Sequence, residues 1–232
     1  MIRSETKHND AGSPPPALRV SEIYRSLLGE SRWAGRVCLV IRLAGCHRRC
    51  RYCDSPQAFT GGEMRTVSDL LRDMAADPSP LVLVTGGEPL LQPAVLDLLA
   101  GLRDAGREVV LETSGTRGSL PLAAVPAGVH RVVDVKTPGS GIPETEVVWD
   151  QFRDLSPADE LKFVCCDRAD YEWARDVVTK GDRLPSGVPV VFSPAQDLLP
   201  AGELADWIVA DALPVRCQVQ LHKVLWPGRP AC

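Results

Sequence analysis

Apolar stretches of strand length alternate with stretches of helical periodicity along most of this chain. The candidate strands are 36–45, 81–87, 108–115, 130–139, 160–166, 188–194 and 215–226. The candidate helices are 66–77, 94–106, 170–179 and 201–212. Strands that are apolar throughout and separated by helices favour a mostly parallel sheet covered by helices. We therefore predict an α/β fold, an incomplete or distorted (β/α) barrel, with ligands bound at the C-terminal ends of its strands.

The alternation of strand-like and helix-like stretches begins only after the first 17 residues, which indicates one domain preceded by a tail. Residues 1–17 are polar, rich in proline and aperiodic, which predicts a disordered segment. The ordered core is expected to span 18–232, a length that suits one or at most two domains. Thr66 is placed to cap the first predicted helix, and Gly106 to end the second.

Charge and hydropathy exclude several classes of function. The chain has 26 Lys and Arg against 30 Asp and Glu, and its net charge of −4 argues against a nucleic-acid surface. No apolar run reaches the ~18 residues of a membrane-spanning helix, and the polar opening MIRSETKHND lacks the core of a signal peptide. We expect a soluble, cytoplasmic protein that binds neither nucleic acid nor membranes.

Cys46, Cys50 and Cys53 form the one tight cysteine cluster, spaced C-x3-C-x2-C in GCHRRCRYCDS (45–55). Three thiolates on one loop can hold a [4Fe–4S] cluster and leave its fourth iron open to another ligand. A structural zinc site is the alternative, but it needs a fourth ligand, and His47 inside the loop is poorly placed to be one. Four other cysteines lie in predicted strands and are expected to be buried apolar residues: Cys38, Cys165, Cys166 and Cys217.

A second motif, TGGEP (85–89), ends the following predicted strand. Glycines without a Cβ let the backbone approach a ligand closely, and the Glu88 carboxylate can accept a hydrogen bond from an ammonium group. Taken alone, this motif could also be a plain turn before a helix.

The two motifs, in this order and at strand ends, resemble those of the radical S-adenosylmethionine (SAM) superfamily, where an aromatic residue such as Tyr52 usually precedes the third cysteine. Other segments resemble the 7-carboxy-7-deazaguanine synthase family. They are EIYRSLLGESRWAGRVCLVIRLAGC (22–46), ETSG (112–115), DVKTPGSG (134–141), ELKFV (160–164) and QVQLHKVLW (218–226). The likeness runs from about Ser21 to Trp226. It departs from the family at Leu28, where the family usually has Gln.

This resemblance implies a radical SAM barrel in which a [4Fe–4S] cluster and SAM generate a 5′-deoxyadenosyl radical. The radical would take hydrogen from C6 of 6-carboxy-5,6,7,8-tetrahydropterin, which rearranges to 7-carboxy-7-deazaguanine with loss of ammonia. Return of the hydrogen would regenerate SAM. The resemblance also implies Mg²⁺, an electron donor such as flavodoxin or ferredoxin, and a homodimer. The alternatives are a glycyl-radical activating enzyme, which shares the three-cysteine loop, and a non-enzymatic zinc-binding module.

The resemblance further implies site residues. Arg42 would fork onto the substrate carboxylate, Glu30 would accept from the donor edge of the pterin, and the Ser55 hydroxyl would bind Mg²⁺. The substrate set is Leu27, Leu28, Gly29, Glu30, Arg42, Thr85 and His222. The SAM set is Tyr52, Cys53, Asp54, Gly87, Glu88, Asp134, Val135, Lys136, Ser193, Pro194, Ala195 and Gln196. Residue type alone would make Arg42 a surface ion pair, His222 a core histidine and Ser55 a loop cap, and Lys162 and Lys223 remain weak candidates.

Overall fold

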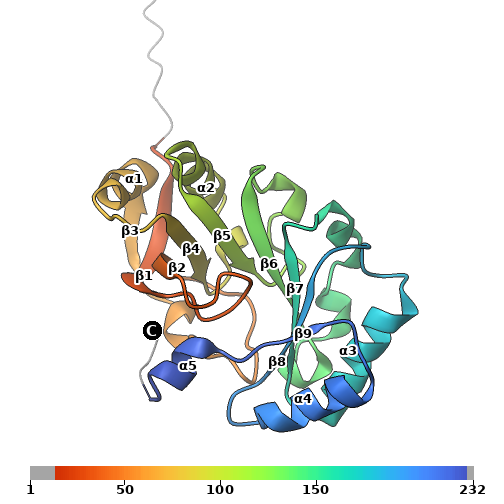
Figure 1. Ribbon diagram of the computed structural model, residues 1–232. Coiled ribbons are helices and arrows are strands. Elements are labelled where there is room, and N and C mark those ends of the chain that lie inside the picture. Colours follow the sequence, from red (N-terminus) through yellow and green to blue (C-terminus); the bar gives the residue numbers. More distant parts are fainter. Residues whose placement is uncertain (1–13, 229–232) are drawn as a thin grey trace, which may run out of the picture.

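One sheet of nine strands organises the described part of the chain, residues 14–228 of the computed structural model. The strand order is β3-β1-β2-β4-β5-β6-β7-β8-β9, and β3 and β9 are its two edges (Figure 1). The strands are β1 Ala17–Leu27, β2 Val37–Leu43, β3 Glu63–Thr66, β4 Leu81–Gly86, β5 Glu108–Thr113, β6 Val129–Val135, β7 Glu160–Cys165, β8 Val190–Pro194 and β9 Arg216–Cys217. All pairings from β2 through β4 to β9 are parallel, so the predicted mostly parallel, incomplete barrel is confirmed.

Helices follow the parallel strands, with α1 and α2 beside the first strands and α3 and α4 beside the last ones (Figure 1). The helices are α1 Val67–Ala75, α2 Val95–Asp104, α3 Arg168–Lys180, α4 Ala201–Ala210 and α5 Leu221–Leu225. Short 3₁₀ turns occur at η1 Pro56–Phe59, η2 Pro89–Leu91, η3 Leu122–Ala124, η4 Pro138–Ser140, η5 Glu144–Glu146 and η6 Trp149–Asp154. Thr66 caps α1 as predicted, because its hydroxyl oxygen accepts a hydrogen bond of 3.1 Å from the Asp69 N–H.

The hydrophobic pattern did not predict β1 or β3, which pair antiparallel with each other. β1 also pairs antiparallel with β2, where Ile23 lies opposite Ile41. Polar residues interrupt the apolar residues of β1, and most of its side chains are only partly buried. The segment therefore lacks the continuous apolar run by which the parallel strands were recognised.

The predicted strand at 215–226 is wrong over most of its length. Only Arg216 and Cys217 pair with β8, and the chain then turns into α5. The Gln218 N–H still donates to the Phe192 carbonyl of β8 at 2.9 Å, while its side-chain amide accepts from the Ser31 N–H (2.7 Å) and donates to the Ser31 carbonyl (2.8 Å). Cys217 is consequently exposed and not buried, unlike Cys38 and the pair 165–166.

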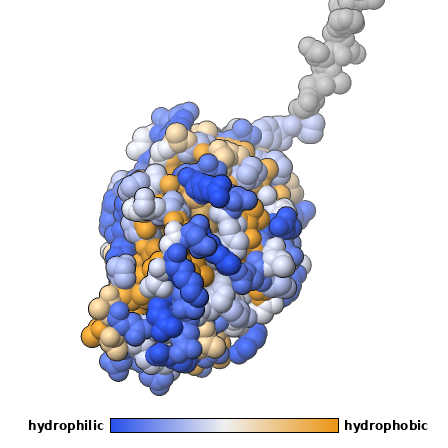
Figure 2. Space-filling model, turned by 90° about the vertical axis from the view of Figure 1, so that its right-hand side faces the viewer, coloured by the Kyte–Doolittle hydropathy of each residue, from blue (hydrophilic) through white to orange (hydrophobic). Residues whose placement is uncertain are grey.

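The predicted tail lies mostly outside the described residues. Of its described part, 14–16 is exposed and irregular, whereas Ala17 already belongs to β1. No helix in the described range is long and apolar enough to cross a membrane. Figure 2 shows that the face at the right of Figure 1 is largely hydrophilic, with smaller hydrophobic areas between the polar ones.

Alternation along the parallel strands separates the two sides of the sheet. Val82 and Val84 of β4 belong to the large core beneath the helices, whereas Leu83 belongs to a smaller cluster with Leu28 and Trp33. The same alternation continues to the C-terminal ends of the strands. There, several strands each direct one polar side chain to the inner side of the sheet, the side on which Leu83 lies. Those side chains form the site described below.

Asp159, just before β7, gives a test of what holds the strands together. Its buried carboxylate pairs with Arg131 at 2.7 Å and accepts from the Ser156 N–H at 2.8 Å. We expect Asp159→Ala to lower the free energy of unfolding by about 3 kcal/mol, since it leaves the guanidinium of Arg131, only 13% exposed, without its carboxylate partner. Denaturant unfolding measures this change. Asp150→Ala, at a side chain that is 87% exposed, is the control and should be nearly neutral.

The same carboxylate gives the pH dependence of stability. Burial opposes its ionisation, but the hydrogen bonds from Arg131 and Ser156 outweigh burial and lower the pKa of Asp159. A lowered native pKa stabilises the fold above the unfolded value of about 3.9, and this contribution is lost as the pH falls through the native pKa. The difference between wild type and Asp159→Ala should therefore shrink below about pH 4. A difference independent of pH from 3 to 7 would contradict this assignment.

Candidate active site

The parallel strands direct polar side chains into one cavity of about 260 Å³ at their C-terminal ends. These side chains are Arg42 of β2, Thr85 of β4, Glu112 of β5, Asp134 of β6 and Lys162 of β7. In the register of the sheet, Arg42 lies opposite Thr85, and Asp134 lies opposite Lys162. The polar groups thus form one layer above the apolar inner side of the sheet, at the end where ligands were predicted.

The charges in this layer are paired with one another. Lys162 Nζ lies 2.6 Å from Glu30 Oε2 and 3.9 Å from Asp134 Oδ2, and Lys136 Nζ lies 3.0 Å from the same Asp134 oxygen. Burial lowers the pKa of both lysines, but the neighbouring carboxylates outweigh burial and leave each pKa above its ordinary value. Both ammonium groups therefore stay charged, although each is about 90% buried.

Glu112 is a cavity residue that the sequence analysis did not single out. Its Oε2 accepts a hydrogen bond of 3.0 Å from the Thr85 hydroxyl. Burial raises the pKa of the Glu112 carboxyl, and Glu30 adds to this, while Lys162 offsets only part of it. The signal that could have found Glu112 was the alternation along β5, where it follows the inward-facing Val110 by two positions.

The cysteine loop, residues 45–55, brings its three clustered thiols to the same cavity. Cys46, Cys50 and Cys53 all line the cavity, are partly exposed and form no disulfide. Gly45 starts the loop with φ +100°, a conformation that suits glycine, and its N–H donates to the Ala58 carbonyl at 2.8 Å. Three free thiols on one wall of a cavity fit the predicted [4Fe–4S] ligand set.

The TGGEP turn packs directly against this loop. The Gly87 N–H donates to the Leu43 carbonyl at 3.0 Å, and the Glu88 N–H donates to the Gly45 carbonyl at 2.8 Å. A Cβ on Gly87 would overlap the Gly45 carbonyl oxygen and lie 2.7 Å from the Cys46 Cβ. The missing side chain therefore lets the two loops share one wall of the cavity.

Three buried polar atoms around the cavity have no protein partner: Glu30 Oε1, Tyr52 Oη and Asp134 Oδ1. Buried polar groups are normally hydrogen-bonded, so these atoms point to a polar ligand as the missing partner. Tyr52 packs its ring against Val164 and Ala195, and Lys136 Nζ lies 5.5 Å from the ring centre. The ends of β7 and β8 thus pack against Tyr52 of the cysteine loop beside the cavity.

α5 closes the opposite side of the cavity. The Leu221 N–H donates to the Gly29 carbonyl at 2.9 Å, and a Cβ on Gly29 would overlap the imidazole of His222. His222 therefore reaches the cavity from this short helix and not from a final strand. Burial lowers the pKa of His222, which keeps its ring neutral at neutral pH.

Arg42 and Ser55 are neighbours at the rim of the cavity. Arg42 donates to the Ser55 hydroxyl and to the Tyr24 hydroxyl, both at 2.9 Å, and the Ser55 hydroxyl donates to Asp54 Oδ1 at 3.0 Å. Burial opposes ionisation of Asp54, but Lys223 and a hydrogen bond from Gln220 outweigh it and lower the Asp54 pKa to about 2. A serine hydroxyl and a carboxylate thus lie together beside the predicted substrate-binding arginine.

Nearly all the predicted site residues line the cavity, and two do not. Glu88 is 1% exposed, and both its oxygens accept hydrogen bonds within the protein, Oε1 from the Thr113 hydroxyl (2.7 Å) and Oε2 from the Ser114 N–H (2.8 Å). These hydrogen bonds fix the Glu88 side chain within the turn, and its expected contact with the ammonium group of SAM stays a prediction. Val135 lies in the core beneath the helices, because alternation in β6 points it away from Asp134.

Comparisons with known proteins agree with this architecture. Residues 40–133, which contain the cysteine loop and TGGEP, match the model of the radical SAM superfamily. QueE from Escherichia coli has a similar structure, with a TM-score of 0.69 at 21% identity over 89% of this chain and 95% of that one. SuiB from Streptococcus suis, bound to S-adenosylmethionine, aligns with a TM-score of 0.53 at 13% identity over 75% of this chain and 44% of its own. The fold and the cysteine loop are those of a radical SAM protein.

Relatives of similar length identify a family within the radical SAM superfamily. The 7-carboxy-7-deazaguanine synthase of Chlorobaculum tepidum is 39% identical over 90% of this chain and 94% of its own. The enzyme of the same name from Koribacter versatilis is also 39% identical, over 90% of this chain and 97% of its own. The chain belongs to the 7-carboxy-7-deazaguanine synthase family.

The close contact at Gly87 gives a test of the site. Gly87→Ala should push the TGGEP turn away from the cysteine loop, and so reduce the iron bound after anaerobic reconstitution and weaken SAM binding about tenfold, or ~1.4 kcal/mol. Iron analysis and equilibrium SAM binding measure both effects. Gly202→Ala on α4, where a Cβ meets no atom within 4 Å, is the matched control. Wild-type iron content and SAM affinity in Gly87→Ala would show that the contact is unimportant.

Proposed function

We propose that this chain converts 6-carboxy-5,6,7,8-tetrahydropterin to 7-carboxy-7-deazaguanine, with release of ammonia, in 7-deazapurine (queuosine-type) biosynthesis. The observation that carries the proposal is the 39% identity to 7-carboxy-7-deazaguanine synthases over 90% of the chain. The cavity supports it, because the three free thiols and the polar layer face the same space.

Cys46, Cys50 and Cys53 would hold the [4Fe–4S] cluster. SAM would lie between the Gly87 turn and the end of β8, where Ser193–Gln196 line the cavity, and Lys136 and the free oxygen of Asp134 would meet its charged groups. When bound, the cluster and SAM supply a 5′-deoxyadenosyl radical. The protein's contribution is to fix the positions of the methionyl and adenosyl parts of SAM and to shield them from water.

The substrate would bind between Arg42 and Glu30. Arg42 uses one N–H of each terminal nitrogen on Ser55 and Tyr24, which leaves a second N–H on each for a carboxylate fork. Glu30 keeps its pairing with Lys162 through one oxygen and offers the unpartnered Oε1 to the N–H edge of the pterin. Glu112, Thr85 and the neutral ring of His222 supply further hydrogen-bonding groups around the ring.

Mg²⁺ would bind at Ser55 together with the substrate. The carboxylates of Asp54 and Glu22 offset the guanidinium of Arg42 beside Ser55, and the negative charge of the substrate would add to their attraction for the metal. A serine hydroxyl is a hard but weak ligand, and Mg²⁺ commonly takes its remaining ligands from substrate and water.

We also propose that the enzyme acts in the cytoplasm as a homodimer, with flavodoxin or ferredoxin as electron donor. Exposed Val224 and Leu225 on α5 give a second copy an apolar surface to cover.

Family membership and the site disfavour the two alternatives. A glycyl-radical activating enzyme acts on a protein, and it would not need the enclosed layer of Arg42, Glu30 and Glu112. A zinc-binding module would need neither the polar layer nor the free carboxylate oxygens.

An anaerobic assay tests the function directly. Reconstituted enzyme with SAM, Mg²⁺, dithionite and the carboxypterin should form 7-carboxy-7-deazaguanine and ammonia, read by mass spectrometry, without net consumption of SAM. Cys46→Ala, Cys50→Ala and Cys53→Ala should each lose the cluster's visible absorbance and the activity, whereas Cys165→Ala should keep both. A protein that binds four irons and cleaves SAM but leaves the carboxypterin unchanged would refute the substrate.

Ser55 gives the test of the metal. Ser55→Ala should raise the Mg²⁺ concentration for half-maximal activity about tenfold, or ~1.4 kcal/mol, because a metal ligand is lost. Ser55→Thr keeps the hydroxyl group and should be nearly neutral. Titrations of activity with Mg²⁺ for the three proteins decide the point. An unchanged Mg²⁺ curve in Ser55→Ala would leave Ser55 as a loop residue.

A further inference from the structure

The outer side of the cysteine loop carries arginines that have no carboxylate partner. Between residues 14 and 228, five arginine or lysine side chains form no ion pair, and three of these belong to the cysteine loop or contact it through the backbone: Arg49, Arg51 and Arg117. The other two, Arg19 and Arg107, donate to backbone carbonyls elsewhere. A chain with a net charge of −4 thus concentrates unneutralised positive charge at one place.

Each of the three arginines has its own contacts at or beside the loop. Arg49 donates to the Cys46 carbonyl at 2.9 Å, and its guanidinium lies 4.2 Å from the ring centre of Phe59 in η1. The Arg51 N–H donates to the Ser140 carbonyl at 2.9 Å, which places it on the η4 side. All three arginines are exposed, and none lines the cavity.

Arg117 lies on the third side of the loop. Its carbonyl oxygen contacts His47 Nε2 at 3.0 Å and accepts a hydrogen bond from Arg48. Glu146, an acidic residue near Arg48 of the loop, is already paired with the Arg48 guanidinium at 2.5 Å. Glu146 is therefore occupied. The Arg117 guanidinium donates to the Thr145 carbonyl at 3.4 and 3.5 Å and has no carboxylate partner among the described residues, so its positive charge is not neutralised.

We infer that this surface, defined by Arg49, Arg51 and Arg117 and called here the basic collar, docks an acidic one-electron carrier protein. The inference rests on the proposed function, since a cluster in the loop is what an electron carrier would serve. Complementary charge steers such encounters, and a local patch does so even on a protein of opposite net charge.

The collar also suits the step it would serve. The carrier loses one electron and the cluster gains it, so that no bond forms or breaks and no other reactant is needed. Arg49 connects the surface to a cluster ligand, because its guanidinium contacts the backbone carbonyl of Cys46. A carrier held on the collar would thus lie on the solvent side of the cysteines, whereas SAM and substrate occupy the cavity side.

The test compares a protein reductant with a small one on the reconstituted holoenzyme. The probe is a reduced flavodoxin with an acidic surface, and the readout is the second-order rate of loss of the cluster's visible absorbance at several salt concentrations. The triple variant Arg49→Gln/Arg51→Gln/Arg117→Gln should be reduced about tenfold more slowly at low salt and should lose most of the salt dependence. The matching triple Lys variant, which keeps the charges, should recover most of the rate.

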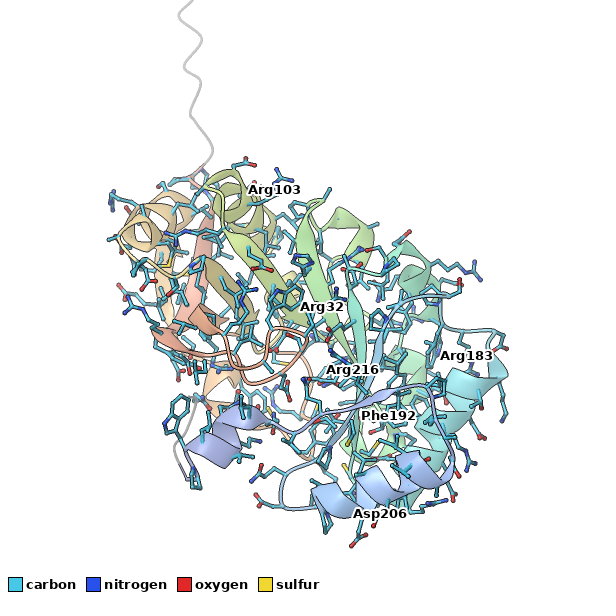
Figure 3. The ribbon with its side chains drawn as sticks, viewed as in Figure 1. Arg32, Arg103, Arg183, Phe192, Asp206 and Arg216 are labelled. Atoms are coloured by element: carbon cyan, nitrogen blue, oxygen red, sulfur yellow. The ribbon has the colours of Figure 1, made fainter. Side chains whose placement is uncertain are left out.

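The matched control removes the same charge elsewhere. Arg72→Gln/Arg103→Gln/Arg153→Gln takes three arginines from elsewhere on the surface, including the partly exposed Arg103 on α2 (Figure 3), and should react like wild type. Dithionite should reduce the cluster, and drive turnover of the carboxypterin, equally well in every variant. If dithionite drives no turnover even in wild type, the proposed function fails.

If dithionite turnover is normal, either of two results overturns the collar. One is a collar variant that accepts electrons from flavodoxin at the wild-type rate and salt dependence. The other is a control variant that slows as much as the collar variant, which would make net charge, not the collar, responsible for the attraction.

Discussion

The buried ion pair between Glu30 and Lys162 holds a loop over the inner side of this open barrel, which would otherwise face water. The sheet ends at two free edges, and its inner side carries charged groups that would otherwise face water. The loop 28–36, between β1 and β2, crosses this inner side and is fastened at the far strands. Lys162 of β7 binds its Glu30 at 2.6 Å. Without this crossing, the polar layer would lie in a wide groove where charges are screened and arginine–carboxylate contacts are weaker.

Further ion pairs and hydrogen bonds hold the loop 28–36 in place. Glu160, which is 1% exposed at the start of β7, pairs with Arg32 of the loop at 3.1 Å and with Arg216 of β9 at 3.0 Å (Figure 3). The two hydrogen bonds between Ser31 and Gln218 lie alongside. The rigid placement of Glu30 over the cavity thus depends on contacts between residues more than 120 positions apart in the chain.

This distance in sequence explains what could be predicted and what could not. Continuous apolar runs predict the parallel strands, and the two-residue period then places Arg42 and Thr85 on the inner side. No local pattern indicates that Lys162 pairs with Glu30, or that Gln218 binds Ser31 just beyond the last strand. Glu88 shows a different case: the motif located the residue, but only the structure shows that its carboxylate accepts hydrogen bonds from Thr113 and Ser114.

Leu28, the departure from the family pattern, fits the same architecture. Its N–H donates to the Arg36 carbonyl at 2.8 Å, and its carbonyl accepts from the Gly35 N–H at 2.8 Å, so the backbone closes the base of the crossing loop. Its side chain is 1% exposed and belongs to the apolar cluster of Trp33 and Leu83, while also lining the cavity. An amide at this position would need partners that this apolar cluster does not provide. Leu28 therefore gives the cavity an apolar wall at this position, whereas the polar groups that line the cavity nearby are those of Glu30, Arg42 and Glu112.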